Sequence, residues 1–229
     1  MTLFRIIDCE TTGMEDDSRV VEIASIDIPS ASPAPCNPQQ TLINPQCAIP
    51  PEVMAIHHIT NDMVRDAPLF GHAHDRFMGA DYYVAHNARF DQKYLGSFGK
   101  PWICTYKCAV VAWPDAPSHS NAALYYWLLQ QSGQPQMPPS CEGGHHRALF
   151  DVHMTASVFT ALIKEKQYGI QRMADITAQP ALLPKINFGK HRGTKFADLP
   201  LDYLQWMNGQ AFDEDVMHTV KQELARREK

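Results

Sequence analysis

Apolar and polar positions follow two different periods along this chain. Apolar runs rich in β-branched residues predict strands at residues 3–7, 20–28, 41–43, 82–85 and 103–105. Helical spacing and capping residues predict helices at 50–55, around Asp91, from 105 to about 113, at 122–133, and from about 147 to 166. In the last of these helices, a buried stripe is expected at Leu149, Val152, Ala156, Phe159 and Ile163. Strands that come first and then alternate with helices predict an α/β fold, a mixed sheet flanked by helices.

The composition changes after Gln167, and this change predicts a second, small unit. Residues 185–196 (KINFGKHRGTKF) hold four lysine or arginine residues and no acid, and residues 201–228 predict a helical tail. We therefore expect a boundary between 168 and 180, with domains at 1–168 and 181–229. Residues 135–144 predict a loop.

Composition and charge narrow the class of protein. Of the 229 residues, 45% are hydrophobic and the net charge is −5, which indicates a globular chain and argues against a protein that coats DNA. No apolar run is long enough to span a bilayer and no secretory signal precedes the first strand, so we expect a cytoplasmic protein that does not enter membranes. The six cysteines include no CxxC pair, so reduced thiols are expected. A zinc site at Cys104 and Cys108 stays possible, without a recognisable ligand spacing.

Two carboxylates stand at the end of the first predicted strand. Asp8 and Glu10 are two positions apart, so on an extended backbone both side chains point to the same face. Two neighbouring carboxylates repel each other in a partly dry site, and a divalent cation relieves this repulsion. Oxygen ligands favour Mg²⁺ or Mn²⁺.

Two further acidic residues and one histidine lie on predicted helices. Asp91 follows the strand at 82–85, in the stretch VAHNARFDQKYL. Asp151 lies on the long helix, and His146 precedes it by five residues near the start of that helix. Each of these residues alone is typical of a solvated surface position, so the argument depends on their combination.

In combination, these residues resemble a known family. D-x-E-T-T-G at 8–13, H-N-A-x-F-D at 86–91 and H-x-x-x-x-D at 146–151 occur in the order seen in the DEDDh exonucleases. This branch of the ribonuclease-H-like superfamily includes proofreading subunits of bacterial replicative polymerases, oligoribonuclease and exodeoxyribonuclease X. The resemblance covers residues 3 to 165, and it implies a ribonuclease-H-like fold and a 3′→5′ exonuclease.

The resemblance also implies a mechanism. Two cations about 3.5–4 Å apart would clamp the attacking and leaving oxygens of a terminal phosphodiester. Asp8 would bridge both cations, Glu10 and Asp151 would hold the cation that carries the attacking water, and Asp91 would hold the other. His146 would be the general base. All five family positions are filled in this chain.

Substrate contacts are expected at three places in the first domain. The backbone near Thr11 and Thr12 is expected to bind the terminal 3′-hydroxyl, and Asn87 belongs to the second motif. A-I-H-H-I-T at 55–60 resembles the family's H-G-I-T segment, which implies that His57 contacts the substrate, although His58 replaces the usual glycine.

The basic segment of the second domain is a further candidate contact. Its glycines, with Lys190, Arg192 and Lys195, suit a phosphate backbone, while a solvated basic turn is the alternative. F-G-K-x-x-G, then D-L-P and Y-L, resembles the C-terminal segment of the exodeoxyribonuclease X group. This resemblance favours DNA as the substrate and DNA repair as the pathway.

Three other functions stay open. The same five residues would serve an RNA exonuclease similar to oligoribonuclease, because the sequence does not reveal contacts to a 2′-hydroxyl. A catalytically silent nucleic-acid-binding module would be favoured by a missing carboxylate, and none is missing. A phosphohydrolase of free nucleotides leaves the basic segment unexplained.

Overall fold

The computed structural model describes residues 1–32, 34–133 and 146–228. Within these residues, five strands form one sheet in the order β3-β2-β1-β4-β5. The strands are β1 (Leu3–Thr11), β2 (Val20–Pro29), β3 (Cys36–Leu42), β4 (Tyr82–Ala85) and β5 (Trp102–Cys104). β1, β2 and β3 pair antiparallel, and β4 and β5 run parallel to β1, so the predicted mixed sheet is confirmed.

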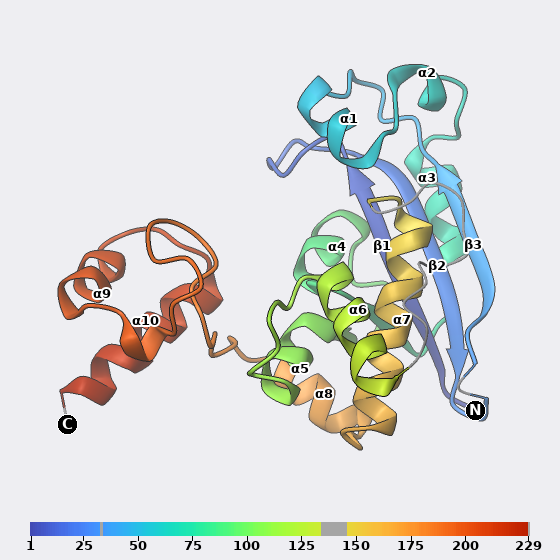
Figure 1. Ribbon diagram of the computed structural model, residues 1–229. Helices are drawn as coiled ribbons and strands as arrows, with labels where there is room; N and C mark the ends of the chain where they lie inside the picture. The colour runs from blue at the N-terminus through green and yellow to red at the C-terminus, as the bar shows by residue number, and fades with distance from the viewer. Residues whose placement is uncertain (33, 134–145, 229) are drawn as a thin grey trace.

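Helices cover both faces of the sheet (Figure 1). One face packs against α5 (Thr105–Ala112), α6 (Asn121–Ser132), α7 (Ala148–Lys164) and α8 (Ile170–Thr177). The other packs against α3 (Phe70–Ala73), the 3₁₀ turn η1 (His74–Phe77) and α4 (Ala88–Leu95). A small cluster at the end of the sheet holds α1 (Pro51–His57) and α2 (Asn61–Val64). The layers follow from the alternation along β1, where Phe4 and Ile6 face α7 and Ile7 and Cys9 face the opposite core.

Several predicted boundaries were wrong. β1 does not stop at Ile7 but continues to Thr11, because its backbone pairs with β2 up to an irregularity between Glu10 and Thr11. β3 begins at Cys36 rather than 41. In the predicted stripe of α7, Ile163 is exposed because it lies in the last turn, where Leu162 fills the core instead. The predicted loop at 135–144 lies outside the described residues.

The C-terminal part has its own core. Residues from the 3₁₀ turn η2 (Phe196–Asp198), α9 (Leu201–Asn208) and α10 (Glu214–Arg227) pack together there. The single helical tail predicted at 201–228 was wrong: α9 ends before Gly209, and α10 starts afresh where the Asp213 carboxylate accepts a hydrogen bond from Val216 N at 2.9 Å.

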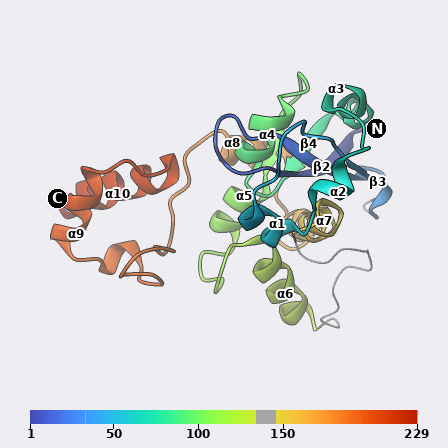
Figure 2. The ribbon, with the colours of Figure 1, turned by 90° about the horizontal axis from the view of Figure 1, so that it is seen from above.

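Helix α8 follows residue 168, the expected end of the first domain. Helix α8 packs in the core of the first domain through Met173. Thr177 Oγ1 also accepts a hydrogen bond from Cys104 N at 2.9 Å. The change of unit therefore falls after residue 177. From there the chain crosses to the C-terminal unit, which lies beside the sheet domain in both views (Figures 1 and 2). Among the described helices, none combines the length and apolarity that a membrane span requires.

Candidate active site

The site is built on the middle strand of the sheet. Asp8 and Glu10 continue the alternation of Phe4 and Ile6, so both carboxylates lie on the face covered by α7. Both side chains are half-buried. Because the pairing of β1 with β2 continues through both residues, the backbone fixes the spacing of these two carboxylates.

Asp91 joins the site from α4. It is 1% exposed, and its Oδ1 accepts a hydrogen bond from the backbone nitrogen of Cys9 at 3.0 Å. Cys9 lies between Asp8 and Glu10, so this bond holds α4 directly against the strand that carries them. Before α4, Asn87 takes a left-handed conformation (φ 67°) that turns the chain from β4 into the helix.

His146 and Asp151 join the site from the start of α7. Ligand atoms of Glu10, His146 and Asp151 lie within 4.8 Å of one another. Within the described residues, these three form the only such group of histidine, cysteine or acidic side chains that could hold a metal ion. His146 has φ 59°, so the backbone turns sharply just before the helix begins. The main chain of Asp151 is also anchored, because Asn121 Nδ2 donates to its carbonyl oxygen at 3.1 Å. The structure thus brings together the residues of all three motifs.

Sequence reasoning missed a buried ion pair beside the site. Glu22 on β2 lies opposite Glu10 in the antiparallel register, and its side chain has no exposed surface. Arg147 holds it with Nε at 3.1 Å and Nη2 at 2.6 Å, Ala148 N donates to it at 2.9 Å, and Gln40 Nε2 donates at 2.7 Å. The glutamate within the apolar run VVEIASIDI was the available signal, because a buried glutamate requires a partner.

The carboxylates of the site repel one another. Burial raises the pKa of Asp8 well above its ordinary value, and the charges of Asp91, Asp151 and Glu10 raise it further. Burial first and the neighbouring acids next also raise the pKa of Glu10. Burial likewise raises the pKa values of Asp91 and Asp151, although the hydrogen bonds from Cys9 and the charge of His146 partly offset this. A cluster of this kind gains from a bound cation.

The predicted contacts near the strand end have unequal access to a substrate. Thr11 and Thr12 are buried where β1 ends, and Thr12 exchanges hydrogen bonds with the backbone of Arg19. Asn87 is exposed. His57 is 1% exposed and its Nδ1 accepts a bond from Ile59 N at 3.0 Å, so a direct contact would require local movement. Its Nε2 is buried and, among the described residues, has no hydrogen-bond partner.

The three basic residues predicted to bind phosphate lie on the C-terminal unit, away from the carboxylates. Lys190, Arg192 and Lys195 are all exposed. Arg192 lines a cleft of about 1120 Å³ between the two units, and Asn87 and Met14 line the opposite wall. Of the three predicted basic residues, Arg192 thus faces a cleft that reaches the edge of the sheet domain.

The cysteines are placed as thiols rather than as metal ligands. Of the six, five are described and all five are free, and Cys141 lies outside the described residues. Burial raises the pKa of Cys104, and it raises the pKa of Cys108 to about 12, which disfavours the thiolate that zinc requires.

Comparison with known proteins decides the family. Residues 6–159 match the model of the RNase_T exonuclease family. The chain belongs to this exonuclease family. The exonuclease is 38% identical over 208 residues to exodeoxyribonuclease 10 of Escherichia coli K12, covering 90% of each chain. Residues 180–220 match a second model, a putative quorum-sensing-regulated virulence factor family.

Solved structures agree with this assignment. The exonuclease is similar to exonuclease X in complex with 5′ overhanging duplex DNA, with a TM-score of 0.66, 39% identity and coverage of 76% of this chain and 99% of that chain. E. coli exonuclease I in complex with a dA16 oligonucleotide matches at a TM-score of 0.56 and 18% identity, over 76% of this chain and 42% of that one, and shows the shared fold alone. The expected fold and family are confirmed.

Proposed function

We propose that this exonuclease removes deoxynucleoside 5′-monophosphates one at a time from the 3′ end of DNA. The convergence of Asp8, Glu10, Asp91, His146 and Asp151 on one end of β1 carries this proposal. The names of two relatives support DNA, since one is an exodeoxyribonuclease and the other was solved with duplex DNA. A cytoplasmic location and a role in DNA repair belong to the same proposal.

Divalent cations fit this donor set. Carboxylates whose pKa values are raised by burial and by one another leave the site short of positive charge, and Glu10, His146 and Asp151 already lie within 4.8 Å. Two Mg²⁺ or Mn²⁺ ions would be held by the four acids Asp8, Glu10, Asp91 and Asp151. When bound, they offset the negative charge of the phosphodiester and lower the pKa of water in the site.

The protein's own groups then have separate tasks. His146 takes the proton of the attacking water, because it is the exposed member of the group and lies beside Glu10 and Asp151. Thr11 and Thr12 offer backbone groups to the terminal sugar where β1 ends. Asn87 and Arg192, which both line the cleft, would contact the strand that leads away.

Paired oligonucleotides test the proposal. Wild-type protein, Asp8→Asn and His146→Gln are incubated with Mg²⁺ and matched 5′-labelled DNA and RNA strands. We expect a ladder of shortened DNA with the wild type, none with EDTA or Asp8→Asn, and a strongly reduced one with His146→Gln. Preferential shortening of RNA would replace the DNA assignment with the oligoribonuclease-like one. Binding without shortening of either strand would favour the silent module.

A further inference from the structure

The C-terminal unit carries a group of aromatic side chains that its own core does not enclose. Tyr203 and Trp206, one turn apart on α9, stack with centroids 5.2 Å apart, and Trp206 meets Phe212 at 6.2 Å. His191 packs edge-on against Tyr203 at 4.4 Å. Trp206 remains 51% exposed. A large ring left half in solvent at the edge of a stack offers a face to another flat molecule.

Positive charge lies directly on this aromatic group. Lys190 Nζ sits 5.1 Å from the centre of the Tyr203 ring. Gly189 makes this approach possible, because it has φ +63° and a side chain there would meet Tyr203 Oη at 3.3 Å. Among the ion pairs of the described residues, none involves Lys190, Arg192 or Lys195. The turn therefore keeps its positive charges for an external anion.

We propose that Trp206, Tyr203 and Lys190 form a second binding site for single-stranded nucleic acid. Exposed aromatic rings stack on nucleobases, and unpaired cations beside them contact the phosphates between those bases. A single strand is specified, since base faces are accessible only where the strand is unpaired. The proposal rests on the proposed function, because it makes this strand part of the exonuclease substrate.

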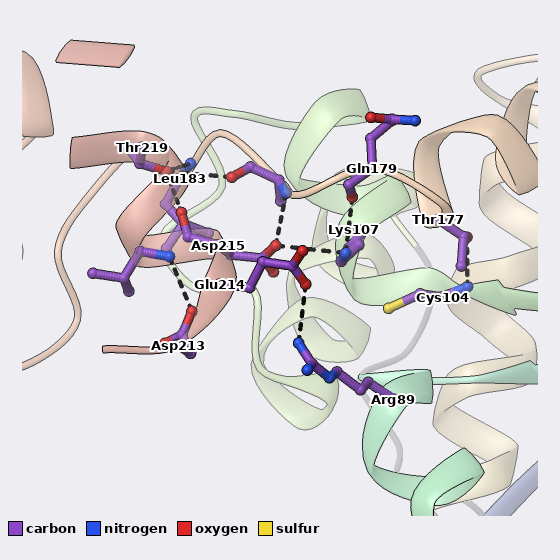
Figure 3. Close-up of polar contacts among 12 residues, drawn as sticks. Arg89, Cys104, Lys107, Thr177, Gln179, Leu183, Asp213, Glu214, Asp215 and Thr219 are labelled. Atoms are coloured by element: carbon purple, nitrogen blue, oxygen red, sulfur yellow. Dashed lines mark hydrogen bonds and ion pairs between the residues drawn. The ribbon is translucent and has the colours of Figure 1, made fainter. Parts of the chain in front are cut away.

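Polar contacts join the C-terminal unit to the sheet domain (Figure 3). This junction would keep such a strand near the catalytic carboxylates. Arg89 pairs with Glu214 at 2.9 Å, and Lys107 with Asp215 at 3.5 Å. Asp215 also accepts a bond from Ala181 N at 2.7 Å, which fixes the linker to α10. A strand held on the C-terminal unit is thereby kept at high local concentration around the active site.

Trp206→Ala tests the site, with Leu201→Ala as the matched control. Both residues lie on α9 and are about equally exposed (51% and 48%), but Leu201 lies outside the aromatic group. We expect Trp206→Ala to raise KM for a strand of about 20 nucleotides by about 5-fold to 100-fold, the loss of one stacked base. Its kcat, and its hydrolysis of the p-nitrophenyl ester of thymidine 5′-phosphate, should match wild type. Leu201→Ala should leave all three unchanged, and Trp206→Phe should retain most of the affinity.

A binding measurement keeps the two proposals distinguishable. The difference in tryptophan fluorescence between wild type and Trp206→Phe gives the emission of Trp206. In EDTA, a single-stranded oligonucleotide should quench this emission, and duplex DNA without overhangs should quench it less. Quenching without hydrolysis would retain the second site and remove the proposed function. Hydrolysis with an unchanged KM in Trp206→Ala, and no Trp206-dependent quenching, would overturn the second site.

Discussion

Replacing Arg147 with methionine separates the folding role of the Glu22–Arg147 pair from its catalytic role. Glu22 has no exposed side-chain surface, and Arg147 is 16% exposed. The substitution leaves a buried carboxylate with only Gln40 Nε2 and Ala148 N as donors. Breaking a buried pair in this way costs about 3 kcal/mol, which lowers Tm by about 6–12 °C in a chain of this size.

The expected loss of activity has a geometric cause. Arg147 directly follows His146, whose φ of 59° places its ring beside Glu10 and Asp151. Without the side-chain bonds from Arg147, the bond from Ala148 N is what still ties this turn to Glu22 on β2, so the turn is held less firmly. A displacement of about 1 Å at a reacting group lowers the rate by about 100-fold, so we expect kcat to fall 10- to 100-fold with KM nearly unchanged.

The same two strands offer a matched control. Arg5 and Asp27 form a second buried pair across β1 and β2, with both side chains 7% exposed. Along β1 this pair lies on the opposite side of Asp8 from Glu10, and its further hydrogen bonds among the described residues go to Met78 and Asn37. Arg5→Met should therefore cost similar stability and leave kcat intact.

Urea unfolding and hydrolysis of the p-nitrophenyl ester of thymidine 5′-phosphate measure the two effects. A double variant, Glu22→Gln with Arg147→Met, should recover part of the stability but not kcat, because it removes the unpaired charge without restoring the anchor. A wild-type kcat in Arg147→Met, or an equal loss in Arg5→Met, would refute the positioning role.

Three further predictions follow from the site and its surroundings. His146→Gln should lower kcat by about 10²–10⁴-fold and flatten the lower limb of the pH–rate profile, as measured with saturating Mg²⁺. In EDTA, thermal unfolding should show that stability rises as pH falls from 8 towards 5. The reason is that the site acids, whose pKa values are raised above those of the unfolded chain, lose their unfavourable charge in that window. Mg²⁺ at about 100 times its Kd should raise Tm by about 5–10 °C at pH 8, and by less at pH 5. His86 should change stability with pH in the opposite direction, because burial lowers its pKa to about 4 and the unfolded chain takes up the proton first. Between pH 6.5 and 4 this histidine should lower the free energy of unfolding by about 2 kcal/mol. The decrease should be absent in His86→Gln.

The local parts of this structure could be predicted from the sequence. The apolar runs gave β2 and β4 closely, and the spacing of Asp8 and Glu10 predicted a shared face because a strand has a period of two. The order of three motifs then predicted which distant residues would join them. The catalytic positions can be recognised in a sequence because their chemistry allows few residue types.

The tertiary parts could not be predicted in the same way. Nothing near Arg147 in the sequence indicates that it will meet Glu22, since the pairing arises only when α7 packs across β2. Helix α8 lies within the range predicted for the boundary, and its contacts with the core through Met173, Ile170 and Ile176 arise only in the folded chain. The break between α9 and α10 depended on an aspartate cap that resembles any other surface acid.

The position of Glu22 bears on how the site tolerates its own charge. Glu10 and Glu22 face each other across β1 and β2, so without compensation the centre of the sheet would hold two adjacent acids. Arg147, the N-cap residue just before α7, compensates one of them permanently. The remaining charge is left on Asp8, Glu10, Asp91 and Asp151, where a cation can reach it. The ion pair thus does two things at once: it removes the repulsion that would oppose folding, and it fixes the turn that carries His146. One ion pair has both effects because the first turn of α7 lies over β2, the strand that pairs with β1. It follows that metal removal should leave the repulsion among the catalytic acids uncompensated while the Glu22–Arg147 ion pair persists. Loss of this ion pair should lower kcat even at saturating metal.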